Sequence, residues 1–436
     1  MALSLALGLW GVRRGGSMWR DEAVTYDMAR RQLPDLWATL GHVDAVHGLY
    51  YLLLHALFGV AGDTDPLLVL RLPSVLAITA ASGTLALLGR RLAGPRAGLL
   101  AGIVFALLPP VQRYAQEGRS YALVCALVVW ATYLLVRGAW AGYGAVVLAA
   151  CLLHEFAVLA PVAHLVALDR EARRTGLRVT AGVCVALAPL AVLSMGQSEQ
   201  VAWIGVGAGA LLGVGATTAV GVACALLLRR TGRRETATVA LPLLVLPPLL
   251  LLSASLVEPL YVDRYVLYAQ AGTALLVGAA LERVRIAVIL VAALALTPFS
   301  VGLRTPGSRT DDVRAIAEAV REAGRGADGV VYLPARRRVW SLPDPTPFRD
   351  LNDLALAAGP SASHTLYGTE VPATAVRSRL LAASRIVALS DPAGQPLDRT
   401  AAEVTKRRVL VAEFEECGTW AVRGARVTVY ARPGSC

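Results

Sequence analysis

The sequence predicts a polytopic α-helical membrane protein, with about eleven transmembrane helices and a small α/β domain at its C-terminal end. Of the 436 residues 56% are hydrophobic and the mean hydropathy is +0.56, which is too apolar for an ordinary soluble domain. Long apolar runs alternate with short Arg-rich clusters. After Leu303 the chain becomes polar and rich in Arg, Pro and Gly, and no run long enough to span a membrane follows.

Charge and cysteine usage exclude several classes of protein. The chain has 42 Lys and Arg residues against 31 Asp and Glu, a net charge of +11, yet the basic residues sit in short clusters between apolar runs. That distribution is typical of a membrane protein that follows the positive-inside rule, and not of a nucleic-acid binder. Lys406 is the sole lysine, a bias typical of a high-GC genome. No Cys-x-x-Cys or His-rich pattern is present, so no cofactor is expected and no metal site is indicated.

The N-terminal region predicts an incomplete apolar helix and a first outer loop at residues 13–65. Met1–Val12 has about half of the ~20 residues that a span needs, so either the start is truncated or neighbouring helices complete it. No small-residue cleavage site follows, which disfavours a signal peptide. Asp21–Leu33 and Leu36–Leu40 have the apolar spacing of short amphipathic helices. Gly48–Val60 is too short to span comfortably, and we expect it to be interfacial or re-entrant.

Ten further apolar segments complete the predicted spans. They are residues 66–89, 97–112, 121–136, 139–153, 156–168, 177–195, 205–228, 237–256, 265–281 and 285–300. With a cytoplasmic N-terminus, most Arg clusters fall in inner loops, and the short outer loops hold only Arg113, Arg119 and Arg264. An odd number of spans then places the tail outside the cytoplasm. We therefore expect a multi-pass protein of a bacterial plasma membrane.

The tail, residues 304–436, predicts a small extracytoplasmic α/β domain after a transmembrane catalytic domain of residues 1–303. Residues 311–323 have the apolar spacing of an amphipathic helix. Four segments predict strands: Val330–Leu333, Arg385–Leu389, Val409–Phe414 and Trp420–Tyr430. Pro343–Pro347 predicts a loop. Cys417 and Cys436 could pair in an oxidising compartment.

Four polar clusters fall on the predicted outer face. They are Asp21-Glu22, Asp44 to His47, Tyr114 to Tyr121, and Tyr261 to Tyr265. Several of these residues have a structural alternative. An acidic pair often caps a helix N-terminus and suits the helix dipole in a first turn, Glu117 and Arg119 could form an interfacial ion pair, and Arg264-Tyr265 could be an interfacial anchor. His154, at a helix junction, could likewise be a structural partner. Ionisable groups at membrane depth are costly and usually functional. The convergence of separate segments on one face therefore favours a functional site.

These motifs together resemble those of the GT-C glycosyltransferases, in the bacterial branch similar to protein O-mannosyltransferases and the lipid A aminoarabinose transferase. The resemblance covers about the first 140 residues and extends loosely to Arg264-Tyr265. One departure is His47-Gly48-Leu49-Tyr50-Tyr51, where related sequences often read His-Pro-Pro-Leu-Tyr-Tyr; it would alter the shape of the loop and leaves the acceptor open. The motifs are Trp19-x-Asp21-Glu22-Ala23, Asp44-x-x-His47-Gly48-Leu49-Tyr50-Tyr51, Leu70-Arg71-Leu72-Pro73-Ser74 and Tyr114-x-Gln116-Glu117-x-Arg119-x-Tyr121.

The resemblance implies transfer of a sugar from a polyprenyl-phosphate donor to an extracytoplasmic hydroxyl, by one inverting displacement. Asp21 is the expected general base, with Glu22 orienting the site, because an attacking hydroxyl must lose its proton. Arginine suits the phosphate by its forked geometry. The expected donor site comprises Arg119, Arg264, Arg20, Glu117 and Tyr265; the expected acceptor or loop supports are His47, Tyr50, Gln116 and His154. No obligatory metal is implied, although a divalent cation could bind the carboxylates adventitiously.

The alternative function is a polytopic transporter or flippase of lipid-linked sugars, which would also place charged residues in a helical bundle. Transporters, however, tend to show internal repeats and midplane sites, whereas these charges gather at one interface. A non-catalytic cell-wall scaffold would not need the acidic and basic motifs. The sugar could be mannose or a related hexose or pentose, and the acceptor a protein, a lipid or a cell-wall glycan. The sequence leaves both open.

Overall fold

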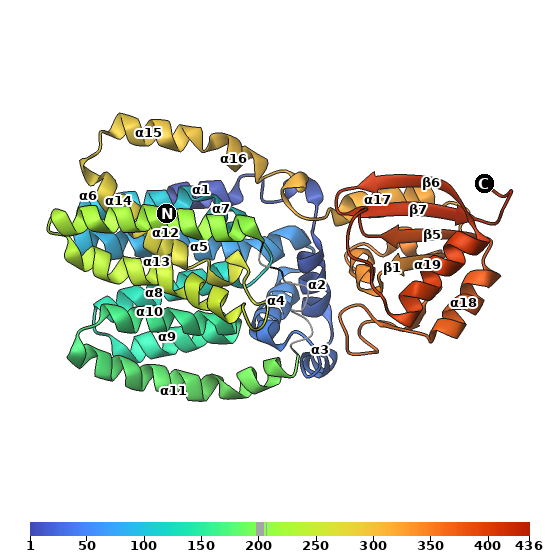
Figure 1. The fold of residues 1–436 in the computed structure, drawn as a ribbon, viewed down its shortest axis with the longest axis horizontal. Coiled ribbons are helices and arrows are strands. Elements are labelled where there is room, and N and C mark those ends of the chain that lie inside the picture. Colours follow the sequence, from blue (N-terminus) through green and yellow to red (C-terminus); the bar gives the residue numbers. More distant parts are fainter. Residues whose placement is uncertain (198–204, 206) are drawn as a thin grey trace. The chain divides into compact units, whose positions relative to one another are not determined.

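The computed structural model describes residues 1–197, 205 and 207–436. Within them the chain divides into two compact units. Unit 1 comprises Met1–Val12, Asp44–Leu53 and Leu68–Arg304, and unit 2 comprises Arg13–Val43, Leu54–Leu67 and Thr305–Cys436. Unit 1 is helical, whereas the tail in unit 2 combines helices with a five-stranded and a two-stranded sheet (Figure 1).

Helices follow one another through unit 1 with short breaks. They are α1 (Ala2–Leu9), η2 (Ala45–His47), α4 (Gly48–Ala61), α5 (Pro66–Ala93), α6 (Pro95–Leu107), α7 (Pro109–Ala115), α8 (Tyr121–Val136), α9 (Trp140–Leu153), η3 (Glu155–Val158), α10 (Leu159–Ala167), α11 (Arg170–Met195), α12 (Ala208–Arg230), α13 (Arg234–Ala254), η5 (Asp263–Val266), α14 (Ala269–Ala280), η6 (Leu281–Arg283), α15 (Ile286–Ala295) and α16 (Thr297–Gly302). The helix α4 begins in unit 1 and passes into unit 2 after Leu53, whereas α5 begins in unit 2 and passes into unit 1 at Leu68. Each predicted apolar segment coincides with one or more of these helices, although residue 206 of the segment 205–228 lies outside the described residues.

Four helices of the described chain are long and apolar enough to cross a membrane, namely α5, α11, α12 and α13. The consecutive helices α6 and α7 pass the same test together but are bent by 64°, because Pro109 starts a new helix. The other predicted spans are shorter helices, such as the 16-residue α8 and the 14-residue α9. The predicted number of eleven spans is therefore not confirmed. The protein is a helical membrane protein with a small C-terminal sheet domain.

Small residues allow the helices of unit 1 to pack closely. The helix α14 packs on α6, α12 and α13, while α9 packs on α8 and α11. A Cβ atom on Gly278 of α14 would lie 2.4 Å from the backbone nitrogen of Ala101 in α6. Likewise, a Cβ on Gly272 would lie 2.5 Å from the carbonyl oxygen of Ala240 in α13. Glycine is therefore required where α14 meets its two neighbours, as is usual where membrane helices touch through their backbones.

The tail in unit 2 forms a mixed sheet between two layers of helices. Its strand order is β2-β1-β5-β7-β6, with β1 parallel to β2 and β5, and with β7 antiparallel to β5 and β6. A separate antiparallel pair is formed by β3 and β4. The elements are α17 (Val313–Ala323), β1 (Gly329–Leu333), η8 (Ala335–Ser341), η9 (Thr346–Phe348), β2 (Asn352–Asp353), β3 (Leu356–Ala358), β4 (Thr369–Glu370), α18 (Ala373–Ala382), β5 (Arg385–Ser390), α19 (Ala401–Glu413), β6 (Glu415–Val422) and β7 (Ala425–Ala431).

Alternation along the strands produces two apolar cores, one on each face of the sheet. On one face, Val387 and Leu389 of β5 pack with α17 and with Trp340 of η8. On the other face, Ile386 and Ala388 of the same strand pack with α18 and α19. Both faces of the central strands are therefore covered, as expected of a sheet with parallel strands.

Two predicted strands of the tail are wrong. Val409–Phe414 is the end of the helix α19, apart from Phe414 beyond its last residue. Its β-branched residues resemble a strand locally, but Glu403, Lys406, Val409 and Leu410 are buried at helical spacing. Trp420–Tyr430 is not one strand but parts of β6 and β7, joined by a turn in which Gly424 has a φ of 81°. The predicted helix and the strands at β1 and β5 agree with the structure to within two residues.

Part of the predicted first outer loop packs on the tail. The helices α2 (Arg20–Arg30) and α3 (Leu33–Leu40) belong to unit 2. Ala23 of α2 joins the α17-side core of the sheet. The backbone N–H of Arg20 donates to Asp311 Oδ1 at 3.1 Å, and Arg31 donates to the carbonyl oxygen of Thr365 at 2.8 Å. Unit 2 is therefore built from segments that lie far apart in the sequence.

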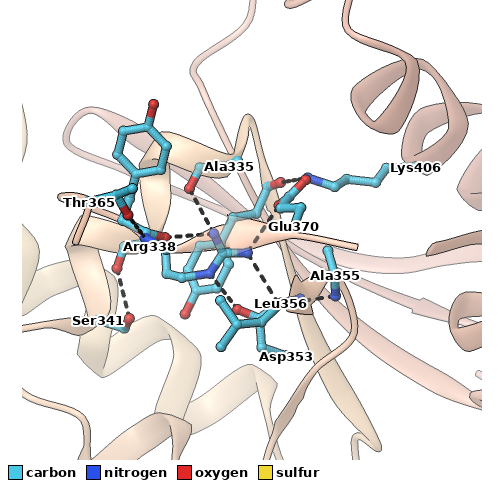
Figure 2. A network of polar contacts seen from close by, with 12 residues as sticks. Ala335, Arg338, Ser341, Asp353, Ala355, Leu356, Thr365, Glu370 and Lys406 are labelled. Atoms are coloured by element: carbon cyan, nitrogen blue, oxygen red, sulfur yellow. Dashed lines mark hydrogen bonds and ion pairs between the residues drawn. The ribbon is translucent and has the colours of Figure 1, made fainter. Parts of the chain in front are cut away.

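A buried polar network joins α19 to the edge of this sheet, as Figure 2 shows. The ammonium of Lys406 donates to Glu370 Oε1 and Glu403 Oε1, both at 2.7 Å, and to the carbonyl oxygen of Tyr332 at 3.0 Å. Arg338 pairs with Asp353 at 2.5 Å and with Glu370 at 3.0 Å. Because Lys406 is 0% exposed, the sole lysine of the chain has a structural role.

The cysteines of the tail form the disulfide Cys417–Cys436, with a Cα–Cα distance of 5.3 Å. The bond ties the chain end to β6. The sequence left this pairing open.

Candidate functional site

The acidic pair Asp21-Glu22 lies in the first turn of α2, in unit 2. The N-cap position is occupied by Trp19, so neither carboxylate is the N-cap residue, and only the first-turn part of that structural alternative agrees with the structure. A negative charge in a first turn still benefits from the helix dipole. The two carboxylates differ in burial, since Asp21 is partly exposed and Glu22 is 0% exposed.

Glu22 forms a buried ion pair with Arg14. The distance from Arg14 NH2 to Glu22 Oε2 is 2.7 Å, and the two side chains are 1% and 0% exposed. Arg14 reaches this position with a φ of 43°, which is uncommon for a residue other than glycine. Removing one partner of a buried pair leaves an uncompensated charge and typically costs ~3–5 kcal/mol. The pair therefore suits Glu22 to a positioning role and leaves Asp21 as the more accessible carboxylate.

A second cluster lies within unit 1 and is centred on the buried guanidinium of Arg119. Its Nη2 atom lies 2.8 Å from His47 Nε2, and its Nη1 atom donates to the hydroxyl of Tyr51 at 3.2 Å. The hydroxyl of Tyr51 in turn donates to Asp44 Oδ2. Because arginine only donates, His47 Nε2 must accept, so His47 is a neutral imidazole with its proton on Nδ1. The Asp44 to His47 loop and the Tyr114 to Tyr121 segment, which were predicted to lie on the same face, thus meet.

The ring of Tyr121 joins this group to Arg264 and Tyr265. Arg264 Nε donates to the Tyr121 hydroxyl at 3.2 Å, and its guanidinium carbon lies 5.5 Å from the centre of the Tyr121 ring. The ring of Tyr265 lies 5.8 Å from that of Tyr121 and 4.6 Å from that of His154. The rings of His47 and His154 are 5.5 Å apart. We call these seven residues the arginine–aromatic cluster: His47, Tyr51, Arg119, Tyr121, His154, Arg264 and Tyr265.

The cluster has a buried part and an accessible part. Arg119, His47 and His154 are 7%, 4% and 3% exposed, whereas Arg264 and Tyr265 are partly exposed. The Nδ1 atoms of both histidines are buried and have no hydrogen-bond partner among the described residues. A buried polar group left unpaired costs about 1–3 kcal/mol. A hydroxyl-rich ligand that accepted from His47 Nδ1, or that paired with His154 Nδ1, would recover that energy.

Other expected site residues have structural partners instead. Tyr50 is buried and donates to the carbonyl oxygen of Leu70 at 3.4 Å. Gln116 donates to the carbonyl oxygens of Gly8 and Trp10 at 2.9 and 2.7 Å, and so ties down the end of α1. These two residues support loops and helix ends, which was one of the two roles expected for them.

Glu117 and Arg20 are not among the seven residues of the arginine–aromatic cluster. The carboxylate of Glu117 is buried, and its Oε1 lies 3.9 Å from Arg113 Nε. The carbonyl oxygen of Glu117 accepts from Ser74 at 2.6 Å, which links the Leu70 to Ser74 motif to this segment. Arg20 belongs to unit 2, whereas Arg119 belongs to unit 1.

Sequence reasoning missed the central position of Tyr121 and the roles of Tyr51 and Asp44, although all three stood in the quoted motifs. The sequence signal that could have identified them is the number of aromatic residues close to Arg119 and Arg264. Within the described residues, no group of three or more His, Cys, Asp or Glu side chains could hold a metal ion. The hydrogen bond from Tyr114 to Asp263 at 2.9 Å adds a further link between the two arginine-bearing segments.

The fold is shared with a solved membrane protein. No protein-family model matches the chain, and no curated protein does. The crystal structure of ArnT from Cupriavidus metallidurans in the apo state is similar with a TM-score of 0.59 at 13% sequence identity, over 94% of this chain and 93% of that one. The crystal structure of the same protein bound to undecaprenyl phosphate is similar with a TM-score of 0.58 at 13% identity, over 100% and 97%. The similarity extends over both units, and at this identity it shows the fold.

Proposed function

We propose that the chain is a membrane glycosyltransferase that moves a sugar from a polyprenyl-phosphate donor to an acceptor hydroxyl outside the cytoplasm. The observation that carries this proposal is the arginine–aromatic cluster, which occurs in a chain that shares its fold with ArnT over its whole length. The second ArnT structure is described as bound to undecaprenyl phosphate, which is a lipid of the proposed donor class. Likeness to a transferase favours this function over transport.

The proton of the acceptor hydroxyl passes to Asp21 in this proposal. Attack by the acceptor oxygen forms a bond to the anomeric carbon, while the bond from that carbon to the phosphate oxygen breaks. The hydroxyl must lose its proton during attack, and a carboxylate within hydrogen-bond reach can take it. Glu22 is held by Arg14 and is the less suitable base, because its carboxylate already has a buried cationic partner.

The developing charge falls on the lipid phosphate, which leaves with one more negative charge than it had in the donor. Arginine stabilises such a charge through charge-assisted hydrogen bonds. Arg264 is the accessible cation of the cluster. The buried Arg119 contacts His47 and Tyr51 and so fixes their positions. We assign contact with the phosphate to both arginines, and to Arg119 also the positioning of His47 and Tyr51. Tyr265 and His154 would line the same site.

The donor sugar is proposed to be mannose or a related hexose or pentose, and the acceptor a protein, a lipid or a cell-wall glycan. The proposed location is a bacterial plasma membrane, with the N-terminus in the cytoplasm and the tail outside. Mass spectrometry of envelope glycans with and without the gene would identify the sugar. A lipid-linked sugar that accumulates in the deletion strain would be the donor.

The proposal is tested on purified protein with polyprenyl-phosphate sugars, by measuring transfer rate and donor affinity for the wild type, Asp21→Asn and Glu22→Gln. A positioned general base contributes typically ~10²–10⁴-fold to rate, so Asp21→Asn should lose that factor while it remains folded and binds donor. Glu22→Gln should instead lose thermal stability, because Arg14 would keep a buried charge without its counter-charge.

Near-normal transfer by Asp21→Asn would end the assignment of Asp21 as the base. If a well-folded Glu22→Gln variant alone were inactive, the role would pass to Glu22. If no polyprenyl-phosphate sugar were bound or consumed by the wild type, the proposed function itself would be wrong.

A further inference from the structure

A cavity of about 280 Å³ lies in unit 2, at the carboxyl ends of two parallel strands. Its lining includes Leu333, the last residue of β1, and Ser390, the last residue of β5, together with Pro334 and Asp391, which follow them. The loop of residues 391–398 also lines it. The volume is close to the lower limit for small-molecule pockets, which begin at ~300 Å³, so a ligand of monosaccharide size would fill it.

The position is a topological switch point. After β1 the chain passes over the α17 face, where Trp340 of η8 is in the core, and then adds β2 on one side of β1. After β5 the chain passes over the opposite face as α19, where Leu410 is in the core, and then adds β6 and β7 on the other side. The two connections diverge, and ligands of open α/β sheets bind in the crevice that such divergence opens.

The walls of the cavity carry donors on two sides. The register pairs Ser390 of β5 with Arg426 of β7, so both side chains lie on the α19 face of the sheet at the mouth of the crevice. Thr428 and Tyr430 follow on the same face. Arg407 of α19 lies on the opposite wall.

The lining carries two carboxylates, Asp391 and Asp398, and two guanidiniums, Arg407 and Arg426. Asp391 pairs with Arg337, and Arg336 lies 3.6 Å from Asp391 and 3.9 Å from Asp398. Neither of these two arginines lines the cavity. Both carboxylates of the lining therefore have cationic partners outside it, and when these are counted, four guanidiniums accompany two carboxylates at the cavity.

The two arginines of the lining differ in their partners. Arg407 donates to the carbonyl oxygen of Asp398, which uses one of its five N–H groups. Arg426 is half-buried, and no ion pair or hydrogen bond to its guanidinium is present among the described residues. A partly buried guanidinium at the end of a pocket favours a carboxylate or phosphate partner.

We propose that this cavity is a binding site for a small anionic sugar, whose phosphate or carboxylate pairs with Arg426 and Arg407 while its ring rests on Tyr430 and Leu410. The site lies within unit 2 and is separate from the donor site proposed above. It would allow the tail to hold an acidic sugar residue, whether that residue is free or part of an envelope polymer.

The test is calorimetric titration of the full-length protein in detergent with glucose 6-phosphate, glucuronate, glucose and inorganic phosphate. Glucose 6-phosphate or glucuronate should bind, and Arg426→Ala should weaken that binding by roughly tenfold or more, because a charge-assisted pair is lost. Arg408→Ala is the matched control, since Arg408 is exposed on α19 next to Arg407 and does not line the cavity. Arg426→Lys keeps the charge and should retain part of the affinity.

Thermal unfolding of each variant separates lost binding from lost folding. Equal binding of glucose and glucose 6-phosphate would overturn the role of the anion, and equal binding of inorganic phosphate would overturn the role of the sugar ring. Unchanged affinity in Arg426→Ala, or no binding of either acidic sugar at millimolar concentration, would overturn the site. None of these outcomes depends on transfer activity, so the proposed function is tested independently.

Discussion

Replacing Lys406 with methionine should strongly destabilise the tail. Lys406 is 0% exposed, and its ammonium is the shared partner of Glu370 and Glu403 (Figure 2). The network contains three carboxylates, including that of Asp353, and two cations, Lys406 and Arg338. Methionine has a similar length and keeps the packing, but it would leave three carboxylates facing one cation.

The expected cost follows from that imbalance. Removing one partner of a buried ion pair typically costs ~3–5 kcal/mol, because the other charge remains buried without compensation. Burial raises the pKa of Glu403 above its ordinary value of 4.5, while Lys406 partly opposes that rise. Without Lys406 the pKa of Glu403 should rise further. A carboxyl group with a raised pKa in the folded state stabilises the fold when protonated, so the deficit of Lys406→Met should shrink as the pH falls from 7 towards 4.5.

The assay is resistance of the tail to protease as temperature is raised, followed on the full-length protein at several pH values. Arg408→Met is the control, because Arg408 is exposed on the same helix and its loss should change stability by no more than ~0.5 kcal/mol. Adding Glu403→Gln to Lys406→Met should restore part of the stability by removing one uncompensated charge. Equal stability of Lys406→Met and Arg408→Met at pH 7, or a deficit that grows as the pH falls, would refute this reasoning.

Two further predictions concern the donor site and the disulfide. Arg119→Ala and Arg264→Ala should weaken donor use by about 2–5 kcal/mol, whereas Arg229→Ala, at an exposed position near the end of α12, should not; equal turnover by all three variants would contradict the phosphate assignment. Cys417 and Cys436 should react with a membrane-impermeant thiol reagent on intact cells only after reduction. Labelling without reduction would exclude the disulfide, and protection after both reduction and denaturation would exclude an extracytoplasmic tail.

Apolar periodicity and length were sufficient to find the helices of unit 1. The predicted segment 121–136 coincides with α8 residue for residue, because apolar runs bounded by polar residues depend on local composition alone. The same reasoning failed at Val409–Phe414, where a short β-branched run fits a strand and a helix end equally well. Only the burial of Glu403 and Lys406 on the same side as Val409 identifies the helix α19. A local sequence pattern could not predict that the charge of Lys406 is buried, because its partners come from β1 and β4.

The sequence by itself determined the helical membrane class, the mixed α/β tail, and the residue types that gather in the arginine–aromatic cluster. Tertiary structure decided how those residues are used. Asp21 and Glu22 are neighbours with the same charge, but α2 places Glu22 in a buried ion pair with Arg14 and leaves Asp21 partly exposed. The cavity at the ends of β1 and β5 likewise exists because connections on opposite faces of the sheet diverge there. Composition and spacing describe the chain one segment at a time, whereas partners and cavities arise from segments that meet only in the fold.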